Sequence, residues 1–132
     1  MDTEAKRVFH VVEEYYSKFS NYENDWQDLL HENLKYTSSL RNRINKKEFI
    51  EINETLQFSV LDFKIFCKFS SGRTACFEVS YRICSNTPEE IIVILKCVEF
   101  FEIEGGKIKA INSYFDSREM IERLSEYKMS LK

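Results

Sequence analysis

The residues best suited to chemistry in this chain lie at the end of its last strand-like run. Residues 107–115 follow a Gly-Gly turn and lead directly into Asp116. Asn112 and Tyr114 share a strand face with Asp116, because side chains two residues apart in a strand point the same way. A carboxyl group placed at the end of a cavity can transfer protons. Asp116 could place an acid at the end of a cavity, and Asn112 and Tyr114 are the polar groups that would join it in binding a ligand, with a solvated sheet end as the alternative.

Asp116 also fits a purely structural role. The segment 116–119 reads Asp-Ser-Arg-Glu, the form of a helix N-cap with glutamate at its third position. A cap contributes about 1 kcal/mol, which is reason enough for an aspartate there. The two roles are compatible, so both stay open.

The elements that must position these residues fall into two groups. Apolar residues at helical spacing predict helices over 5–19 and 26–31, and a third that begins with a capping box at 45–48. A short strand at 34–40 lies between the second and third helices. From residue 57 the apolar period changes to two, which predicts strands over 57–69, 73–83, 91–103 and 107–115, and a closing helix follows over 117–127.

Two details of the strands are specific enough to test. Residues 91–103 are apolar on both faces, which predicts a central strand covered on both sides. A three-residue loop at 70–72 sets the register of the first hairpin so that Cys67 faces Ala75. Cys67 and Cys76 then lie on opposite faces and unbonded, unless a bulge intervenes.

This order of elements predicts an α+β fold in which a strongly curved antiparallel sheet wraps on the N-terminal helices. Such a cone-shaped, cystatin-like roll leaves an interior whose mouth is the default binding site. The length of 132 residues favours one domain spanning 1–132. An aromatic content of 14% suits a sheet-rich core or an aromatic-lined cavity.

Composition also bounds the partners. A net charge of −3 gives no electrostatic basis for binding nucleic acid or an anionic membrane. No apolar run has the length of a membrane span, and the charged residues within 1–20 exclude a signal peptide, so we expect a cytoplasmic protein. The 4 cysteines form no CxxC and have no histidine nearby in sequence. We predict neither a metal nor a cofactor.

Several segments resemble a known family. Residues 11–19 (VVEEYYSKF) and 24–36 (NDWQDLLHENLKY) resemble the opening of nuclear-transport-factor-2-like domains, particularly SnoaL-like polyketide cyclases and ketosteroid isomerases. Residues 45–50, and 106–108 together with Tyr114 and Asp116, extend the resemblance over most of the chain. The resemblance implies the conical α+β fold and a pocket for a small apolar molecule.

The resemblance also implies roles for single residues. Tyr15 occupies the position of the isomerases' oxyanion donor, although it also suits the core. Asp116 matches the cyclases' acid, whose pKa desolvation at an apolar mouth would raise. Trp26 lies where the family's second helix borders the cavity, which implies a ligand contact, with core packing or a dimer contact as alternatives. The isomerases' general base has no counterpart in 36–40, no strand carries the cyclases' histidine, and Glu99 is the nearest strand candidate for the isomerases' second acid.

Two functions follow as hypotheses. The first is a SnoaL-like domain that binds a small apolar ligand in its conical pocket, with cyclase- or isomerase-type proton transfer. The alternative is a non-catalytic, dimeric interaction module of the same fold. In both, a homodimer through the outer sheet face would cover the second apolar face predicted for 91–103.

Overall fold

The computed structural model describes residues 3–55, 58–86, 88–116, 118 and 122. Three helices precede or interrupt the sheet: α1 (Thr3–Ser20), the 3₁₀-helix η1 (Asn24–Leu29) and α2 (Lys46–Glu54). The predicted capping box is confirmed, because the Asn45 side chain accepts from the Glu48 backbone and the Glu48 side chain accepts from the Asn45 backbone. The closing helix predicted over 117–127 lies outside the described residues, apart from 118 and 122.

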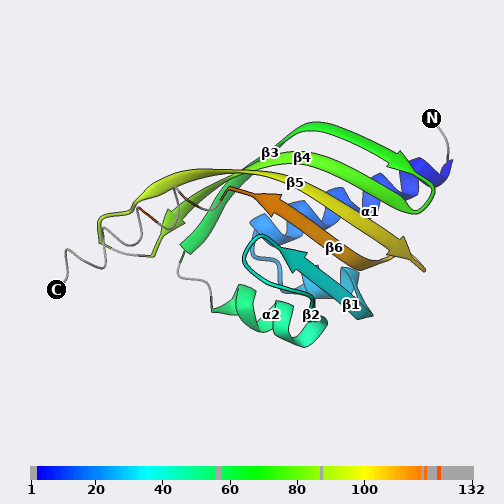
Figure 1. The fold of residues 1–132 in the computed structure, drawn as a ribbon, viewed down its shortest axis with the longest axis horizontal. Helices are drawn as coiled ribbons and strands as arrows, with labels where there is room; N and C mark the ends of the chain where they lie inside the picture. The colour runs from blue at the N-terminus through cyan, green and yellow to red at the C-terminus, as the bar shows by residue number, and fades with distance from the viewer. Residues whose placement is uncertain (1–2, 56–57, 87, 117, 119–121, 123–132) are drawn as a thin grey trace.

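Six strands form one open, mixed sheet in the order β2-β1-β6-β5-β4-β3. Only β1 and β6 pair in parallel, and the other neighbours are antiparallel. The long strands bend along their length, and α1 crosses one face of the sheet while α2 lies beside β1 (Figure 1). This arrangement confirms the predicted α+β cone. The strands are β1 (Leu30–Ser38), β2 (Ile44–Asn45), β3 (Phe58–Ser71), β4 (Thr74–Ser85), β5 (Ile92–Glu104) and β6 (Lys107–Phe115).

The core fills the space between α1 and the face of the sheet that it covers, here called the inner face. Tyr16 from α1, Phe77 from β4 and Phe101 from β5 are each at most 1% exposed. Their rings meet edge to face, with centroids 5.5 to 6.0 Å apart, a favourable geometry for aromatic pairs. Each strand can bury its inner side chains here because its side chains alternate between the two faces.

The predicted register of the first hairpin is wrong. Ser71 pairs with Thr74, so the turn has two residues, and Cys67 lies opposite Glu78 rather than Ala75. Two register shifts, between Val60 and Asp62 and between Ile65 and Cys67, move the pairing along β3. Cys67 and Cys76 consequently share the outer face, and all four cysteines are free. A bulge adds one residue and thereby reverses the face of everything beyond it.

Strand β5 is buried on one face only, which corrects the prediction that both faces are covered. Its odd-numbered side chains from Val93 to Ile103 point inward, whereas Ile94, Val98 and Phe100 are 57%, 39% and 37% exposed. The apolar outer positions therefore belong to the surface of the single chain. None of the helices in the described part of the chain has the length and apolar character needed to cross a membrane.

Candidate functional site

A cavity of about 290 Å³ lies between the inner face of the sheet and the helices. Its walls are mainly apolar, with Phe49 and Ile52 from α2, Phe58 from β3 and Leu95 from β5. This volume is close to the lower limit of small-molecule sites, which span about 300–1,000 Å³. The cavity therefore suits a small, largely apolar molecule. Its polar side chains are Tyr15, Tyr36, Ser38, Arg41, Asn53, Tyr81, Glu99 and Ser113.

Glu99 is the buried acid of this cavity. Its side chain projects from the inner face of β5, and the residue is only 6% exposed. The hydroxyl of Tyr16 donates to Glu99 Oε1 over 2.8 Å, and the hydroxyl of Tyr81 donates to the same oxygen. Two phenols from different elements thus fix one carboxyl oxygen, which leaves Oε2 outside both of these bonds. Hydrogen bonds that hold a polar group in one orientation are what a preorganised site requires.

The surroundings of Glu99 favour its protonated form. Burial is the largest cause and raises the carboxyl pKa, whereas hydrogen bonds from Tyr81, Ser113 and Tyr16 lower it in part. Burial, and next the negative charge that Glu99 carries when it is ionised, raise the pKa of Tyr36 to about 12. The same two causes raise the pKa values of Tyr16 and Tyr81 further, so all three tyrosines stay neutral. A neutral carboxylic acid can donate a hydrogen bond or a proton to a bound oxygen.

A row of polar groups crosses the sheet wall of the cavity. Ser38 on β1 lies opposite Ser113 on β6, and Ser113 lies opposite Glu99 on β5. All three line the cavity. Residues in register on adjacent strands point to the same face, so the row is a direct result of strand pairing. It gives an otherwise apolar wall a line of hydrogen-bonding groups.

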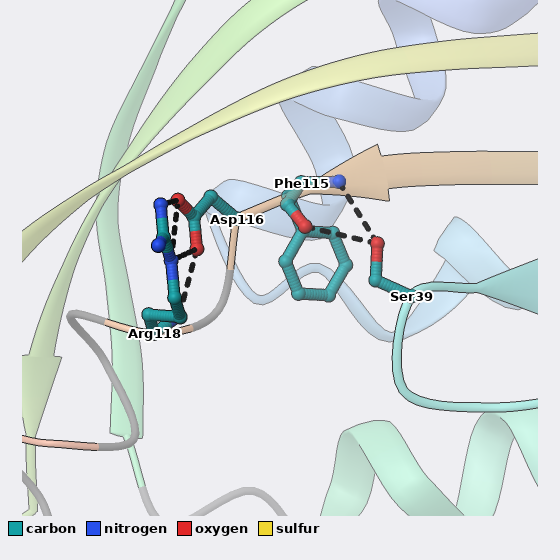
Figure 2. Close-up of polar contacts among 4 residues, drawn as sticks. All are labelled: Ser39, Phe115, Asp116 and Arg118. Atoms are coloured by element: carbon teal, nitrogen blue, oxygen red, sulfur yellow. Dashed lines mark hydrogen bonds and ion pairs between the residues drawn. The ribbon is translucent and has the colours of Figure 1, made fainter.

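The structure does not place Asp116 in this cavity. Asp116 is exposed, is not among the lining residues, and forms an ion pair with Arg118 over 2.7 Å (Figure 2). The pKa of its carboxyl group falls to about 2, first because the Arg118 side chain hydrogen bonds to it. The expectation that desolvation raises this pKa is therefore wrong. The Arg118 backbone N–H donates to Asp116 Oδ1 over 3.0 Å, a contact of the capping type.

Tyr15 and Trp26 both occupy the helical side of the core. Tyr15 lines the cavity and is 6% exposed, so its proposed oxyanion role stays a prediction that the location permits. Trp26 is 8% exposed and packs against Tyr15, Phe19 and Phe49, but it is not among the lining residues. Its position matches the alternative of core packing.

Asn112 and Tyr114 lie on the outer face. Strand β6 presents Ile111, Ser113 and Phe115 to the inside, whereas Tyr114 is 55% exposed and packs on Phe100. A ligand bound by Asn112 or Tyr114 would therefore meet the outer face, away from Glu99. The structure separates both residues from the cavity, and their ligand-binding role stays a prediction.

Sequence reasoning named Glu99 as the nearest strand candidate for the isomerases' second acid without selecting it as a site residue, and it did not name Ser113. A signal existed, because Glu99 interrupts the odd-numbered apolar series that runs from Val93 to Ile103. An acid within the buried face of a strand is unusual and needs partners. The signal was hidden because the even-numbered positions of the same strand are also apolar.

Comparisons with solved structures identify the fold. An M. tuberculosis LEH-like epoxide hydrolase superimposes with a TM-score of 0.77 and 19% identity, over 97% of this chain and 96% of that chain. An NTF2-like protein of unknown function from Cytophaga hutchinsonii superimposes with a TM-score of 0.70 and 19% identity, over 92% of this chain and 99% of that chain. The chain has the nuclear-transport-factor-2-like fold.

A third structure of this nuclear-transport-factor-2-like group is a protein from Jannaschia sp. CCS1 that is itself only assigned as a SnoaL-like polyketide cyclase. It gives a TM-score of 0.79 with 10% identity, over 92% of this chain and 93% of that chain. Neither a protein-family model nor a curated protein matches the sequence. The resemblance noted in the sequence is thus confirmed for the fold.

Proposed function

We propose that this chain binds a small, largely apolar molecule that carries an oxygen function, and that protonated Glu99 donates to that oxygen. The observation that carries the proposal is a carboxyl group 6% exposed at the wall of an apolar cavity, held by two tyrosine hydroxyls. Structures of the same fold that are described as an epoxide hydrolase and assigned as a polyketide cyclase support ligand binding or catalysis at such a site.

The chemistry best suited to this arrangement is proton transfer of the cyclase or isomerase type. A bound carbonyl that accepts a hydrogen bond from the neutral acid can carry more negative charge when a neighbouring carbon loses its proton. Glu99 is the one carboxyl group among the described lining residues, so the proton would pass from carbon to water. Tyr15 lines the same cavity and would serve as a second donor. Asp116, in contrast, would have to act from outside the cavity, so Glu99 replaces it as the proposed acid.

Binding of 2-naphthol, a fused aromatic body with one hydroxyl group, tests the proposal. Calorimetry should show one saturable site in the wild type and in Glu99→Gln, because a glutamine amide also donates hydrogen bonds. Glu99→Leu should bind about tenfold more weakly, since a lost hydrogen bond in a buried site costs about 1–3 kcal/mol. Glu102→Gln, an exposed change on the same strand, is the matched control. Equal affinity in the wild type and folded Glu99→Leu would refute the proposed role.

A second function, self-association, is favoured by the apolar outer face. Ile94, Val98 and Phe100 of β5, Tyr114 of β6 and Phe69 of β3 are 37% to 59% exposed in the single chain. Contiguous exposed apolar side chains of this kind mark interaction sites. We propose that a second copy of the chain covers them.

Sedimentation velocity at micromolar concentration tests this second proposal. The wild type should sediment as a dimer and Phe100→Glu as a monomer, because the introduced charge would be buried without a partner. Lys47→Glu introduces a glutamate at an exposed position of α2 and should leave the dimer intact. A monomeric wild type would contradict the proposal.

A further inference from the structure

Arg41 adds a cation to the wall of the cavity. It lies three residues after Ser38 in the loop that leaves β1, and it lines the same cavity as Glu99. Among the described lining residues, Arg41 is the one basic side chain and Glu99 the one acidic side chain. Arg41 is exposed whereas Glu99 is buried, so the two side chains differ in solvent access as well as in chemistry.

The loop that carries Arg41 is held in place by its own hydrogen bonds. The Ser38 backbone N–H donates to the Arg41 carbonyl over 2.8 Å, and the Arg41 and Leu40 backbone N–H groups each donate to Ser38 Oγ over 3.1 Å. Ser39 Oγ donates to the Phe115 carbonyl and accepts from the Phe115 N–H, which fastens the loop to β6 (Figure 2). Arg41 is thus attached to a fixed part of the wall.

The guanidinium group of Arg41 is available to a ligand. Within the described part of the chain, no carboxylate lies within ion-pair distance of Arg41. Glu99 instead accepts hydrogen bonds from the hydroxyls of Tyr16 and Tyr81, and its protonated form carries no charge. A guanidinium beside an apolar cavity matches a carboxylate well, because it can donate two parallel hydrogen bonds.

The strand register sets the distance between the two polar ends. Ser38, Ser113 and Glu99 lie in register on three adjacent strands. Strands are spaced about 4.8 Å apart, so Ser38 and Glu99 are separated by about 10 Å along the wall. Arg41 lies at the Ser38 end of this row. A ligand that satisfies both ends would carry its anionic group and its oxygen function on opposite sides of a body that spans most of this distance.

Building on the function proposed above, we infer that the ligands of this cavity are small aromatic or alicyclic carboxylic acids that carry a keto or hydroxyl group at the far end. The carboxylate binds Arg41, the ring lies among the apolar walls, and the distal oxygen meets Glu99. This assigns Arg41 a ligand-binding role for which the residue types in the sequence gave no indication.

Two probes that differ by one carboxylate test the inference. The wild type should bind 6-hydroxy-2-naphthoate about tenfold more tightly than 2-naphthol, since hydrogen bonds to charged groups are the stronger ones. Arg41→Gln should bring the ratio of the two affinities close to one. Arg43→Gln, two residues away and exposed beside Asn112 and Lys109 in a different hollow, should keep the advantage.

The outcomes separate this inference from the proposed function. Glu99-dependent binding of 2-naphthol with no gain from the carboxylate would overturn the inference and leave the proposed function standing. A gain that disappears equally in Arg41→Gln and Arg43→Gln would also overturn it, because general charge would then be the cause. If neither probe binds the folded wild type, the proposed function fails and this inference fails with it.

Discussion

The hydroxyl of Tyr16 on α1 donates a 2.8 Å hydrogen bond to Oε1 of Glu99 on β5, across 83 positions of the sequence. The bond joins the helix to the sheet at the wall of the cavity. It also gives a buried carboxyl group one of the partners that make its burial tolerable. Stability and the candidate chemistry are therefore linked at this pair.

Removing the Tyr16 hydroxyl should weaken the fold. Tyr16→Phe deletes a buried donor and leaves part of Glu99 unsatisfied, which costs about 1–3 kcal/mol of unfolding free energy. Tyr114→Phe removes the same atom from a residue that is 55% exposed and should change stability by less than about 0.5 kcal/mol. Urea unfolding followed by circular dichroism measures both. Equal losses in the two variants would show that the bond to Glu99 adds nothing.

Glu99 should make the protein less stable as the pH rises. Burial raises its pKa above the ordinary 4.5, so between 4.5 and the native pKa the unfolded chain binds fewer protons than the native one. The free energy of unfolding then falls by at most about 1.4 kcal/mol per pH unit. The effect is absent below 4.5 and complete above the native pKa.

The measurement compares the wild type with Glu99→Gln from about pH 4 to about pH 8. The stability of the wild type relative to the variant should fall over this range, because glutamine does not titrate. Neighbouring Tyr15, Tyr36, Tyr81 and Cys97 have raised pKa values and remain neutral there. A stability difference that stays constant with pH would mean that burial does not raise the pKa of Glu99.

Asp116→Asn should leave 2-naphthol binding unchanged. The carboxyl group of Asp116 is exposed, pairs with Arg118 and is not among the residues lining the cavity. The direct comparison is Glu99→Leu, for which we expect about a tenfold loss of affinity. If Asp116→Asn weakens binding as much as Glu99→Leu does, the original prediction that Asp116 belongs to the site regains its support.

Asn45→Ala should lower stability by about 1 kcal/mol. The Asn45 side chain accepts from the Glu48 N–H over 2.9 Å at the start of α2, and alanine cannot replace this bond. Thermal unfolding measures the loss. Asn42→Ala, in the exposed loop just before the helix, is the control and should have little effect. Because α2 supplies Phe49 and Ile52 to the cavity, the same variant should also weaken 2-naphthol binding if its first turn frays.

Local residue patterns were sufficient for the elements and the fold class. The capping box at Asn45 and Glu48 specifies a helix start through bonds within four residues. Gly105 and Gly106 adopt positive φ values of 58° and 75°, which glycine tolerates best, and the predicted tight turn joins β5 to β6 there. Each of these signals is short-range, so the sequence alone carries it.

Local patterns in the chain predicted the start of α2, the Gly-Gly turn and the alternation of the strands, because hydrogen bonds and side-chain spacing within a few residues fix these features. Which face of β6 points inward depends on the folded chain as a whole, and so does the choice of Ser113 over Asn112 and Tyr114. The tertiary structure also decided that Glu99 is buried and that Asp116 is exposed. These outcomes depend on register shifts and on the covering helix α1, and a shift of one residue in pairing exchanges the two faces of a strand.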